Sequence, residues 1–569
     1  MVTHRWGRRA AASGAISLAL VLGACQPSQR AEFSPATDPV SGFRIDDHAQ
    51  GPAPEIRGAT KGGTVTIVGS ADLGLEFGDP GGPAGPDVLV LYRQLLLRGL
   101  TGLIEAIAPD GTGRLRLVGD LATDTGRTTD GCRTWTYTLR DGVSFQDGTK
   151  ITAEAVARGI HVSIINPFTT TLAERPTVQI PDDKTVVVAF PSPQCDFPLA
   201  AAQPSMTPLP PGRQNNVTGT DVVASGPYQV ESVEHDRRTG VTKKLTLVRN
   251  PHWDPASDPL RHAYPDRWEI DVTAADRAEV AARLVEDSGP VQTALMWESL
   301  VGSGALTTVA GNAAAMARAV QGDTTYTIYL GINTRRVTDV NVRRSINYAY
   351  NKHDHIEIIG GKHAARPATT ITGPTVPGYR QFDLYPAPAT GDGDMARALL
   401  AGKTVPPLTY CYFSGSPTRD KAAAVAKNSL ERAGLQIVLD PLGPSLFTVS
   451  RSPYANCDLF PLSWGQEYPW NSTVVGTLLR DRGPSLLEDP LPFADPGVTT
   501  ELDRLAREPD LQVAAAGYQA VDERVMHDII PVVPILHVRW FSLVGSKIAG
   551  AHISTTWGRV SLLDIHVLR

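Results

Sequence analysis

The chain has 569 residues, of which 42% are hydrophobic and 20% are charged, a balance that is typical of a globular protein and excludes a disordered one. A chain of this length does not fold around a single core, so we expect at least two lobes. The formal net charge is −6 and no basic block occurs, which argues against a nucleic-acid partner.

The N-terminus carries the features of an export signal. Three arginines within the first nine residues precede an apolar run over residues 10–24, which is too short to span a bilayer. The run ends in Leu22-Gly23-Ala24-Cys25, which resembles a bacterial lipobox, the motif in which the cysteine is acylated and becomes the new N-terminus. We therefore expect residues 1–24 to be a signal peptide. Cys25 is expected to carry diacylglyceryl and palmitate, which anchor the protein to the outer face of the cell membrane. The alternative is a secretory signal with an incidental cysteine.

Residues 25–61 are expected to comprise the lipidated cysteine and a flexible tether. From residue 26 onward this segment is rich in Pro, Ser, Ala and Asp, and it shows neither a helical nor a strand period. The folded body is therefore predicted to begin near Gly62.

From Gly62 onward, strand-like and helical patterns alternate along the chain. Apolar residues at three- and four-residue spacing predict helices, and short runs of β-branched and aromatic residues predict strands. The predicted strands cover residues 64–68, 134–139, 184–190, 245–248, 268–272, 408–413 and 458–462, and the predicted helices cover residues 88–100, 276–285, 342–360, 395–400 and 419–433. Residues 529–541 form a β-rich run that Pro531 and Pro534 interrupt. This mixture predicts an α/β fold with mixed sheets flanked by helices.

Four cysteines follow Cys25, namely Cys132, Cys195, Cys411 and Cys457. An even number of cysteines in an oxidising compartment predicts two disulfides, and four cysteines allow three pairings. Nearest-neighbour pairing, Cys132–Cys195 and Cys411–Cys457, keeps each bridge within one region of the chain. The alternative is four buried free thiols.

Several sequence blocks after Gly62 occur together, and in order, in one known protein family. The most specific block is Leu139-Arg140-Asp141-Gly142-Val143-Ser144-Phe145-Gln146-Asp147-Gly148-Thr149-Lys150-Ile151-Thr152-Ala153-Glu154. The other blocks cover residues 62–67, 79–80, 225–228, 247–251, 331–334 and 339–349. In these blocks the chain resembles the extracellular solute-binding proteins of family 5, the oligopeptide-, dipeptide- and nickel-binding group.

The resemblance implies a two-lobed periplasmic-binding-protein-like α/β fold, of type II with an extra inserted subdomain. Lobe I is expected over residues 62–110, 215–325 and 532–569, the inserted subdomain over residues 111–214, and lobe II over residues 326–531. The lobes should close around a ligand by hinge rotation near residues 325 and 531. The implied function is to capture short peptides as a monomer and to deliver them to the permease subunits of an ABC importer.

A candidate ligand anchor lies at Trp464 and Glu467. In peptide-binding relatives, a tryptophan followed three positions later by an aspartate holds the ammonium group of the peptide, and here Trp464 and Glu467 have that spacing. A pair formed by a buried ammonium and a carboxylate is charge-assisted and directional, so it can fix the position of a bound peptide. Glu is one methylene longer than Asp, and the alternative for Glu467 is a solvated loop carboxylate beside core aromatics.

Further ligand-lining residues are expected around this anchor and in lobe I. The segment that follows the predicted strand 458–462 also contains Tyr468, Trp470 and Asn471. The resemblance adds Glu76, Phe77 and Tyr92, although the apolar helix around Tyr92 favours a core position for that residue.

The sequence contains no catalytic motif, so we expect neither an enzyme nor a cofactor. His353, His355 and His363 invite a metal-site interpretation, but His353 and His355 are two positions apart in a predicted helix and point to different faces. We therefore expect no metal there. The alternative functions are binding of a metal chelate, haem or oligosaccharide in the same cleft, and ligand sensing without transport.

Overall fold

The computed structural model describes residues 42–73, 75, 77, 86–107, 113–165, 174–212, 222–443, 456–480, 491–493 and 495–569. The expected signal peptide, the lipidation site Cys25 and the candidate lining residue Glu76 lie outside these residues. Within the described ranges, no helix is both long enough and apolar enough to cross a membrane.

Lobe I is built on a five-stranded sheet with the strand order β11-β2-β10-β9-β8. The strands are β2 (Thr64–Ser70), β8 (Tyr228–His235), β9 (Thr242–Arg249), β10 (Arg267–Ala274) and β11 (Ala294–Met296). β2 pairs in parallel with both β10 and β11. Val65 and Ile67 of β2 and Trp268 and Ile270 of β10 are buried at alternating positions, as the period of a half-buried strand requires.

Helices of lobe I accompany this sheet, next to a small sheet whose strands come from lobe I, from the expected tether and from the expected inserted subdomain. The helices are α1 (Pro86–Leu91), α4 (Arg277–Glu286), α5 (Ala305–Ala310) and α6 (Ala313–Met316). A small sheet of order β1-β4-β3 contains β1 (Phe43–Asp46), β3 (Thr101–Ile107) and β4 (Gly113–Gly119). The chain ends in lobe I with β18 (Ile548–Ala549) and β19 (His566–Val567), and the apolar residues of this C-terminal segment share one core cluster with β2 and β10.

The inserted subdomain contains a three-stranded sheet of order β5-β7-β6. It comprises β5 (Thr134–Thr138), α2 (Ala153–Ile165), β6 (Thr177–Asp182), β7 (Thr185–Ala189) and α3 (Phe197–Ala200).

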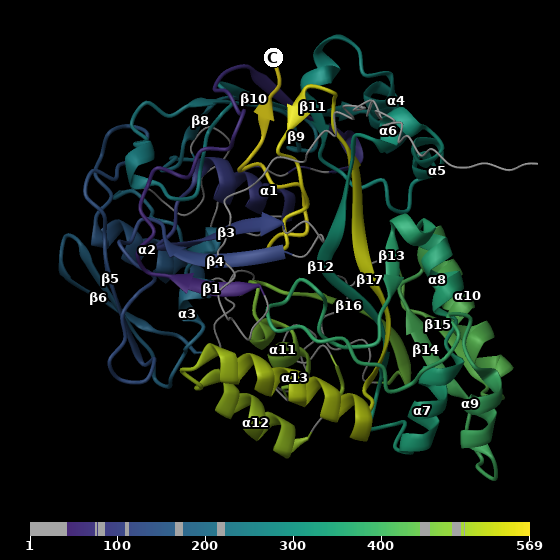
Figure 1. Ribbon diagram of the computed structural model, residues 1–569. Coiled ribbons are helices and arrows are strands. Elements are labelled where there is room, and N and C mark those ends of the chain that lie inside the picture. The colour runs from purple at the N-terminus through teal and green to yellow at the C-terminus, as the bar shows by residue number, and fades with distance from the viewer. Residues whose placement is uncertain are drawn as a thin grey trace, which may run out of the picture.

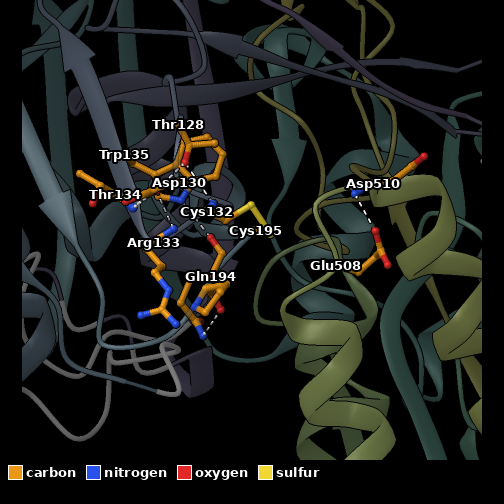
Figure 2. The surroundings of a disulfide bond; sticks show 11 residues. Thr128, Asp130, Cys132, Arg133, Thr134, Trp135, Gln194, Cys195, Glu508 and Asp510 are labelled. Atoms are coloured by element: carbon orange, nitrogen blue, oxygen red, sulfur yellow. Dashed lines mark hydrogen bonds between the residues drawn. A yellow bond between two sulfur atoms is a disulfide. The ribbon is translucent and has the colours of Figure 1, made fainter.

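A disulfide joins Cys132 and Cys195 in this subdomain, with their Cα atoms 4.9 Å apart. Figure 2 shows its surroundings, in which the indole N–H of Trp135 donates to the carbonyl of Gln194 and the N–H of Gln194 donates to the carbonyl of Cys132. A second disulfide in lobe II joins Cys411 and Cys457, with their Cα atoms 5.7 Å apart. Both nearest-neighbour pairings are therefore confirmed.

Lobe II is built on a six-stranded sheet of order β13-β17-β12-β16-β14-β15. The strands are β12 (Ala319–Ile332), β13 (Ala365–Pro367), β14 (Leu408–Tyr412), β15 (Ile437–Pro441), β16 (Leu459–Gly465) and β17 (Val532–Leu543). The helices are α7 (Val340–Ala349), α8 (Lys352–Ile359), α9 (Gly393–Leu400), α10 (Pro417–Arg432), α11 (Val475–Leu478), α12 (Pro496–Ala506) and α13 (Leu511–Asp528). Helices α7 to α10 and helices α11 to α13 form two separate groups in the view of Figure 1.

Strands β12 and β17 are long, antiparallel and shared by the two lobes (Figure 1). Their upper ends, where Ala319 pairs with Leu543, join the core of lobe I helices, and their lower ends lie in the lobe II sheet. The register shifts between Asp323 and Thr327 and again near Pro534. Pro534 thus lies inside β17 at an irregularity, because a proline has no N–H to donate to a regular ladder.

Two predicted helices differ from the observed ones. The helix predicted over residues 88–100 ends earlier in the structure. α1 passes into a π-helical turn, Tyr92–Leu96, and Leu97 is extended. The predicted helix 342–360 is two helices. Tyr350 is extended between them, and the Asn351 side chain caps α8 by accepting from the N–H of Asp354.

The last part of the expected tether is folded. Residues 42–61 contain β1, which pairs in parallel with β4, and Phe43 is buried. The N–H of Ile56 donates to the hydroxyl of Tyr264 (2.9 Å), and His262 contacts the carbonyl of Pro54 (2.7 Å). Tertiary contacts therefore order a segment whose composition alone favoured a tether.

A buried ionic cluster fixes the small sheet onto lobe I. Asp120, which follows β4, accepts hydrogen bonds from Arg93 (2.9 Å), Arg98 (2.8 Å) and Arg261 (3.1 Å). Asp258 pairs with Arg261 at 2.9 Å. Burial alone would raise the pKa of Asp120, but the three guanidinium groups outweigh it and hold this pKa well below its usual range.

Replacing Asp120 should destabilise the protein strongly. Asp120→Asn leaves three buried guanidinium groups with one carboxylate, so we expect the unfolding free energy to fall by about 3–5 kcal/mol. Chemical denaturation measures this. Asp141→Asn is the control, because the ion pair of Asp141 with Lys184 is exposed and its loss should change the stability little. Equal stabilities of the two variants would contradict the structural role of the cluster.

Candidate ligand-binding site

The candidate anchor lies where β16 leaves the lobe II sheet. β16 pairs antiparallel with β12, with Gly465 opposite Tyr326 and Trp464 opposite Thr327. After Gly465 the chain turns away from the sheet. Thr473 then holds the loop, because its carbonyl accepts from the indole N–H of Trp464 (2.9 Å) and its hydroxyl accepts from the N–H of Glu467 (3.3 Å).

Residues on both sides of Glu467 contact other parts of the protein. The Gln466 amide donates to the carbonyl of Thr555 in the C-terminal segment of lobe I, at 2.9 Å. The Tyr468 hydroxyl donates to the carboxylate of Asp196 in the inserted subdomain, also at 2.9 Å. Glu467 therefore lies between two contacts that join lobe II to the rest of the molecule.

The carboxylate of Glu467 is open to a ligand. Its side chain is exposed, and the described residues offer the carboxylate neither a hydrogen bond nor an ion pair. The protein nevertheless surrounds it closely enough that partial loss of water raises its pKa. An accessible carboxylate with unused hydrogen-bonding capacity, in a partly dehydrated position, is suited to an ammonium group.

The other candidates in this loop are less accessible than Glu467. Trp464 is half-buried, and Tyr468, Trp470 and Asn471 are buried. Trp470 packs against Phe43 with ring centroids 5.6 Å apart, and the side-chain oxygen of Asn471 accepts from the hydroxyl of Thr372 at 3.0 Å. In this structure these three buried side chains hold the loop in place.

The lobe I candidates are packed into a different core cluster. Phe77 and Tyr92 are buried, and their rings are 5.3 Å apart. Both belong to the core of lobe I, whereas Trp464, Tyr468 and Trp470 belong to the cluster that joins lobe II to the inserted subdomain. Phe77 and Tyr92 thus take part in the core of lobe I in this structure.

Four further candidate residues have no local sequence signal, namely Tyr326, Asp87, Trp540 and Arg559. Tyr326 on β12 is 37% exposed, and burial and then the charge of Glu467 raise its pKa. Arg559 in the C-terminal segment pairs with Asp87 at 2.9 Å and lies over the ring of Trp540 at 4.3 Å. These residues come from distant parts of the chain, and only the strand register and the path of the C-terminal segment bring them together.

The three histidines considered for a metal site each contact a different part of the protein. His355 is buried and bonded to the hydroxyl of Tyr350 (2.9 Å), whereas His353 is exposed beside Asp354. His363 contacts the side chain of Gln321. Among the residues with described positions, no group of three or more His, Cys, Asp or Glu side chains is arranged to hold a metal ion.

Several proteins of known class resemble this chain. A curated protein of Escherichia coli (strain K12), the probable D,D-dipeptide-binding periplasmic protein DdpA, is 23% identical over 357 residues. That match covers 60% of this chain and 64% of the relative, so the chain spans less than two thirds of the relative's length.

Solved structures match over more of the chain. Clavulanic acid biosynthesis oligopeptide binding protein 2 is 25% identical with a TM-score of 0.77, and the match covers 92% of this chain and 99% of that one. DppA from Helicobacter pylori in complex with the peptide STSA is 18% identical with a TM-score of 0.64, and the match covers 90% of this chain and 99% of that one. The predicted two-lobed periplasmic-binding-protein fold is confirmed.

The family follows from a sequence match that runs through most of the inserted subdomain, the middle segment of lobe I and most of lobe II. Residues 116–485 match the family model of bacterial extracellular solute-binding proteins, family 5 Middle. This range contains the Leu139–Glu154 block, Trp464 and Glu467. The chain therefore belongs to family 5 of the bacterial extracellular solute-binding proteins.

Proposed function

We propose that this protein captures short peptides between its lobes and delivers them to the permease subunits of an ABC importer. The observation that carries the proposal is the unpartnered, accessible carboxylate of Glu467 between two interlobe contacts. The names of relatives as oligopeptide-, tripeptide- and D,D-dipeptide-binding proteins support a peptide ligand. The protein binds and releases its ligand without catalysis, and acts as a monomer.

The charge of the peptide N-terminus explains why this carboxylate matters. Lobe closure removes the ammonium group from water, and without an anionic partner this costs several kcal/mol. Glu467 supplies that partner, and Trp464 shields the pair from water. Main-chain groups then hold the extended peptide as an added strand, which gives affinity with tolerance for different side chains.

Closure takes place where β12 and β17 pass from one lobe to the other, near residue 325 and near residues 537–539 opposite it, because residue 531 lies at the far end of the lobe II sheet. Lobe I then comprises residues 62–110, 215–325 and the chain that follows this crossing, the inserted subdomain residues 111–214, and lobe II residues 326–531 with the first part of β17. The register shift of β12 between Asp323 and Thr327 supports a hinge there, because a bulge interrupts the ladder hydrogen bonds and eases local bending.

The most direct test identifies what the protein carries. The protein is purified under native conditions and then denatured, and the released small molecules are identified by mass spectrometry. Short peptides are the expected result. A metal chelate, haem or oligosaccharide in stoichiometric amount, with no binding of any member of a tripeptide library, would overturn the proposal. Peptide binding without uptake in cells that contain the partner permease would favour a sensing role instead.

Glu467→Gln should weaken the binding of a free-amine peptide more than that of its N-acetylated counterpart. The variant keeps the shape of the side chain but removes the charge that partners the ammonium group, so we expect a coupling of roughly 2 kcal/mol, about thirtyfold in affinity. Isothermal titration calorimetry on both peptides measures it. The exposed Glu431→Gln is the matched control. Equal losses for both peptides would show that Glu467 is not the anchor.

The binding of a free-amine peptide should weaken in mild acid. Only ionised Glu467 attracts the ammonium group, and the pKa of this carboxyl lies above its ordinary value of 4.5 because burial disfavours the charge. Affinity should therefore be constant at neutral pH and fall as the pH drops through this raised pKa. Titrations between about pH 4 and 8 check this. The N-acetylated peptide and the Glu467→Gln variant should show no such decline, and a parallel decline in either would point to another group.

Cys25→Ala should release the protein from membranes while leaving its fold intact. The lipid on Cys25 is proposed as the anchor, so the variant should appear in the soluble fraction after cell fractionation. Its circular dichroism spectrum and thermal midpoint should match those of the wild-type mature protein. A variant that stays on membranes after a salt wash would contradict lipid anchoring at this residue.

A further inference from the structure

Tyr326 is an exposed aromatic residue directly beside the Glu467 loop. It is the one aromatic among the large, exposed, hydrophobic side chains of the described residues. Its partner across the β12–β16 ladder is Gly465, two residues before Glu467. A Cβ atom at position 465 would lie 3.1 Å from the Cδ1 atom of Tyr326. A residue larger than glycine at this position would therefore crowd the Tyr326 ring.

Lobe I approaches Tyr326 from the other side through residues 554–559. The carboxylate of Glu105 fixes this segment by accepting from the hydroxyl of Ser554 (2.6 Å) and from the N–H of Thr556 (3.1 Å). At Gly558 a Cβ atom would lie 2.8 Å from the N atom of Thr325, so the segment meets β12 at the residue before Tyr326.

Arg559 is thereby held at a defined place beside Tyr326. Its guanidinium group pairs with Asp87 at 2.9 Å and lies 4.3 Å from the ring centroid of Trp540, and its side chain is 15% exposed. Two separate contacts thus fix the direction of this cation, which lowers the entropy lost when it binds a ligand group.

Tyr326 lies within reach of charged groups of both signs, because its strand partner Gly465 precedes Glu467 by two residues and the segment before Arg559 meets β12 at Thr325. Burial and the nearby charges of Glu467 and Asp87 raise the pKa of Tyr326, and the charge of Arg559 acts in the opposite direction. Within the described part of the chain, no hydrogen bond joins this hydroxyl to Glu467 or to Arg559. A phenol that interacts electrostatically with two charged groups without bonding to either is available to a ligand group placed between them.

We propose that Tyr326, together with Arg559, binds the oxygen atom next to the ligand's ammonium group, so that the site selects an α-amino acyl unit over a simple amine. This inference rests on the proposed function. An α-amino acyl unit carries a positive ammonium group and, next to it, a carbonyl oxygen with partial negative charge. The ammonium group pairs with Glu467, and the carbonyl oxygen accepts hydrogen bonds from Tyr326 and Arg559. A simple amine would leave the phenol and the guanidinium unpaired when the lobes close, which disfavours its binding.

The test compares Tyr326→Phe with the wild type on two ligands. The probes are the tightest-binding member of a tripeptide library and its analogue in which sulfur replaces the first carbonyl oxygen. The wild type should prefer the oxygen peptide several-fold, because sulfur is the weaker acceptor. Tyr326→Phe should weaken the oxygen peptide by about fivefold to tenfold and should largely abolish this preference.

Two further variants control the comparison. Tyr348→Phe makes the same change on α7, where the ring of Tyr348 packs on Tyr385, and should leave both affinities unchanged. The double variant Asp87→Asn/Arg559→Gln removes the ion pair as a unit, so that no carboxylate is left without its partner, and should also reduce the preference for oxygen. Circular dichroism spectra confirm that each variant is folded.

The outcomes separate this inference from the proposed function. Peptide binding that depends on Glu467 but is unchanged in Tyr326→Phe would overturn the inference and leave the function standing. A loss in Tyr326→Phe with an undiminished preference for oxygen would also overturn it, because Tyr326 would then contact another part of the ligand. The absence of any tripeptide binding by the folded wild type would overturn both.

Discussion

The arrangement of the molecule depends on the antiparallel pairing of β12 with β17. These two strands run from the core of the lobe I helices into the middle of the lobe II sheet, so one ladder of hydrogen bonds relates the two lobes. Three residues of the candidate site take their positions from this ladder. Tyr326 lies on β12, Trp540 lies on β17, and Glu467 follows the strand that pairs with the other edge of β12. Because the period of a strand is two residues, a slip of one position would turn Tyr326 to the opposite face.

Two carboxylates of the protein, Asp120 and Glu467, differ in how their charge is used. Asp120 is buried and receives hydrogen bonds from three arginines, so its charge is fully used in holding the small sheet onto lobe I. Glu467 is accessible, lacks a partner among the described residues and is partly dehydrated. A folded protein has no structural reason to keep such a carboxylate partly dehydrated and unpaired, because its desolvation is not offset by any contact. The ligand ammonium group that we propose as its partner would supply the missing cation.

The aromatic residues around the anchor divide their roles in the same way. Trp470 packs on Phe43, and Tyr468 bonds Asp196, so these side chains connect lobe II to the β1-β4-β3 sheet and the inserted subdomain. Tyr326 is 37% exposed. The buried aromatics define where the loop lies, and the exposed one, beside Glu467, is the side chain to which we assign ligand discrimination.

The sequence by itself determined the α/β class and the main strands, because these depend on local patterns, and the family, because several blocks occur in the right order. Nearest-neighbour disulfide pairing was predicted among three possibilities, and the structure confirmed it. Alternation along β2 and β10 reflects burial of one face, and each cysteine pair lies within one compact region of the chain. The three-residue spacing of Trp464 and Glu467 also identified the anchor candidate without any structure. Only the tertiary structure decided which neighbours those residues have. Phe43 belongs to a segment whose composition favours a flexible chain, yet it packs against Trp470. Tyr92 and Phe77 are used in the core of lobe I, whereas Tyr326 and Arg559, which no local motif marks, come from distant segments to lie where the charge of Arg559 acts on Tyr326. The reason is physical: propensity and periodicity act over a few residues, but contacts between distant segments arise from strand register and from burial shared between the lobes.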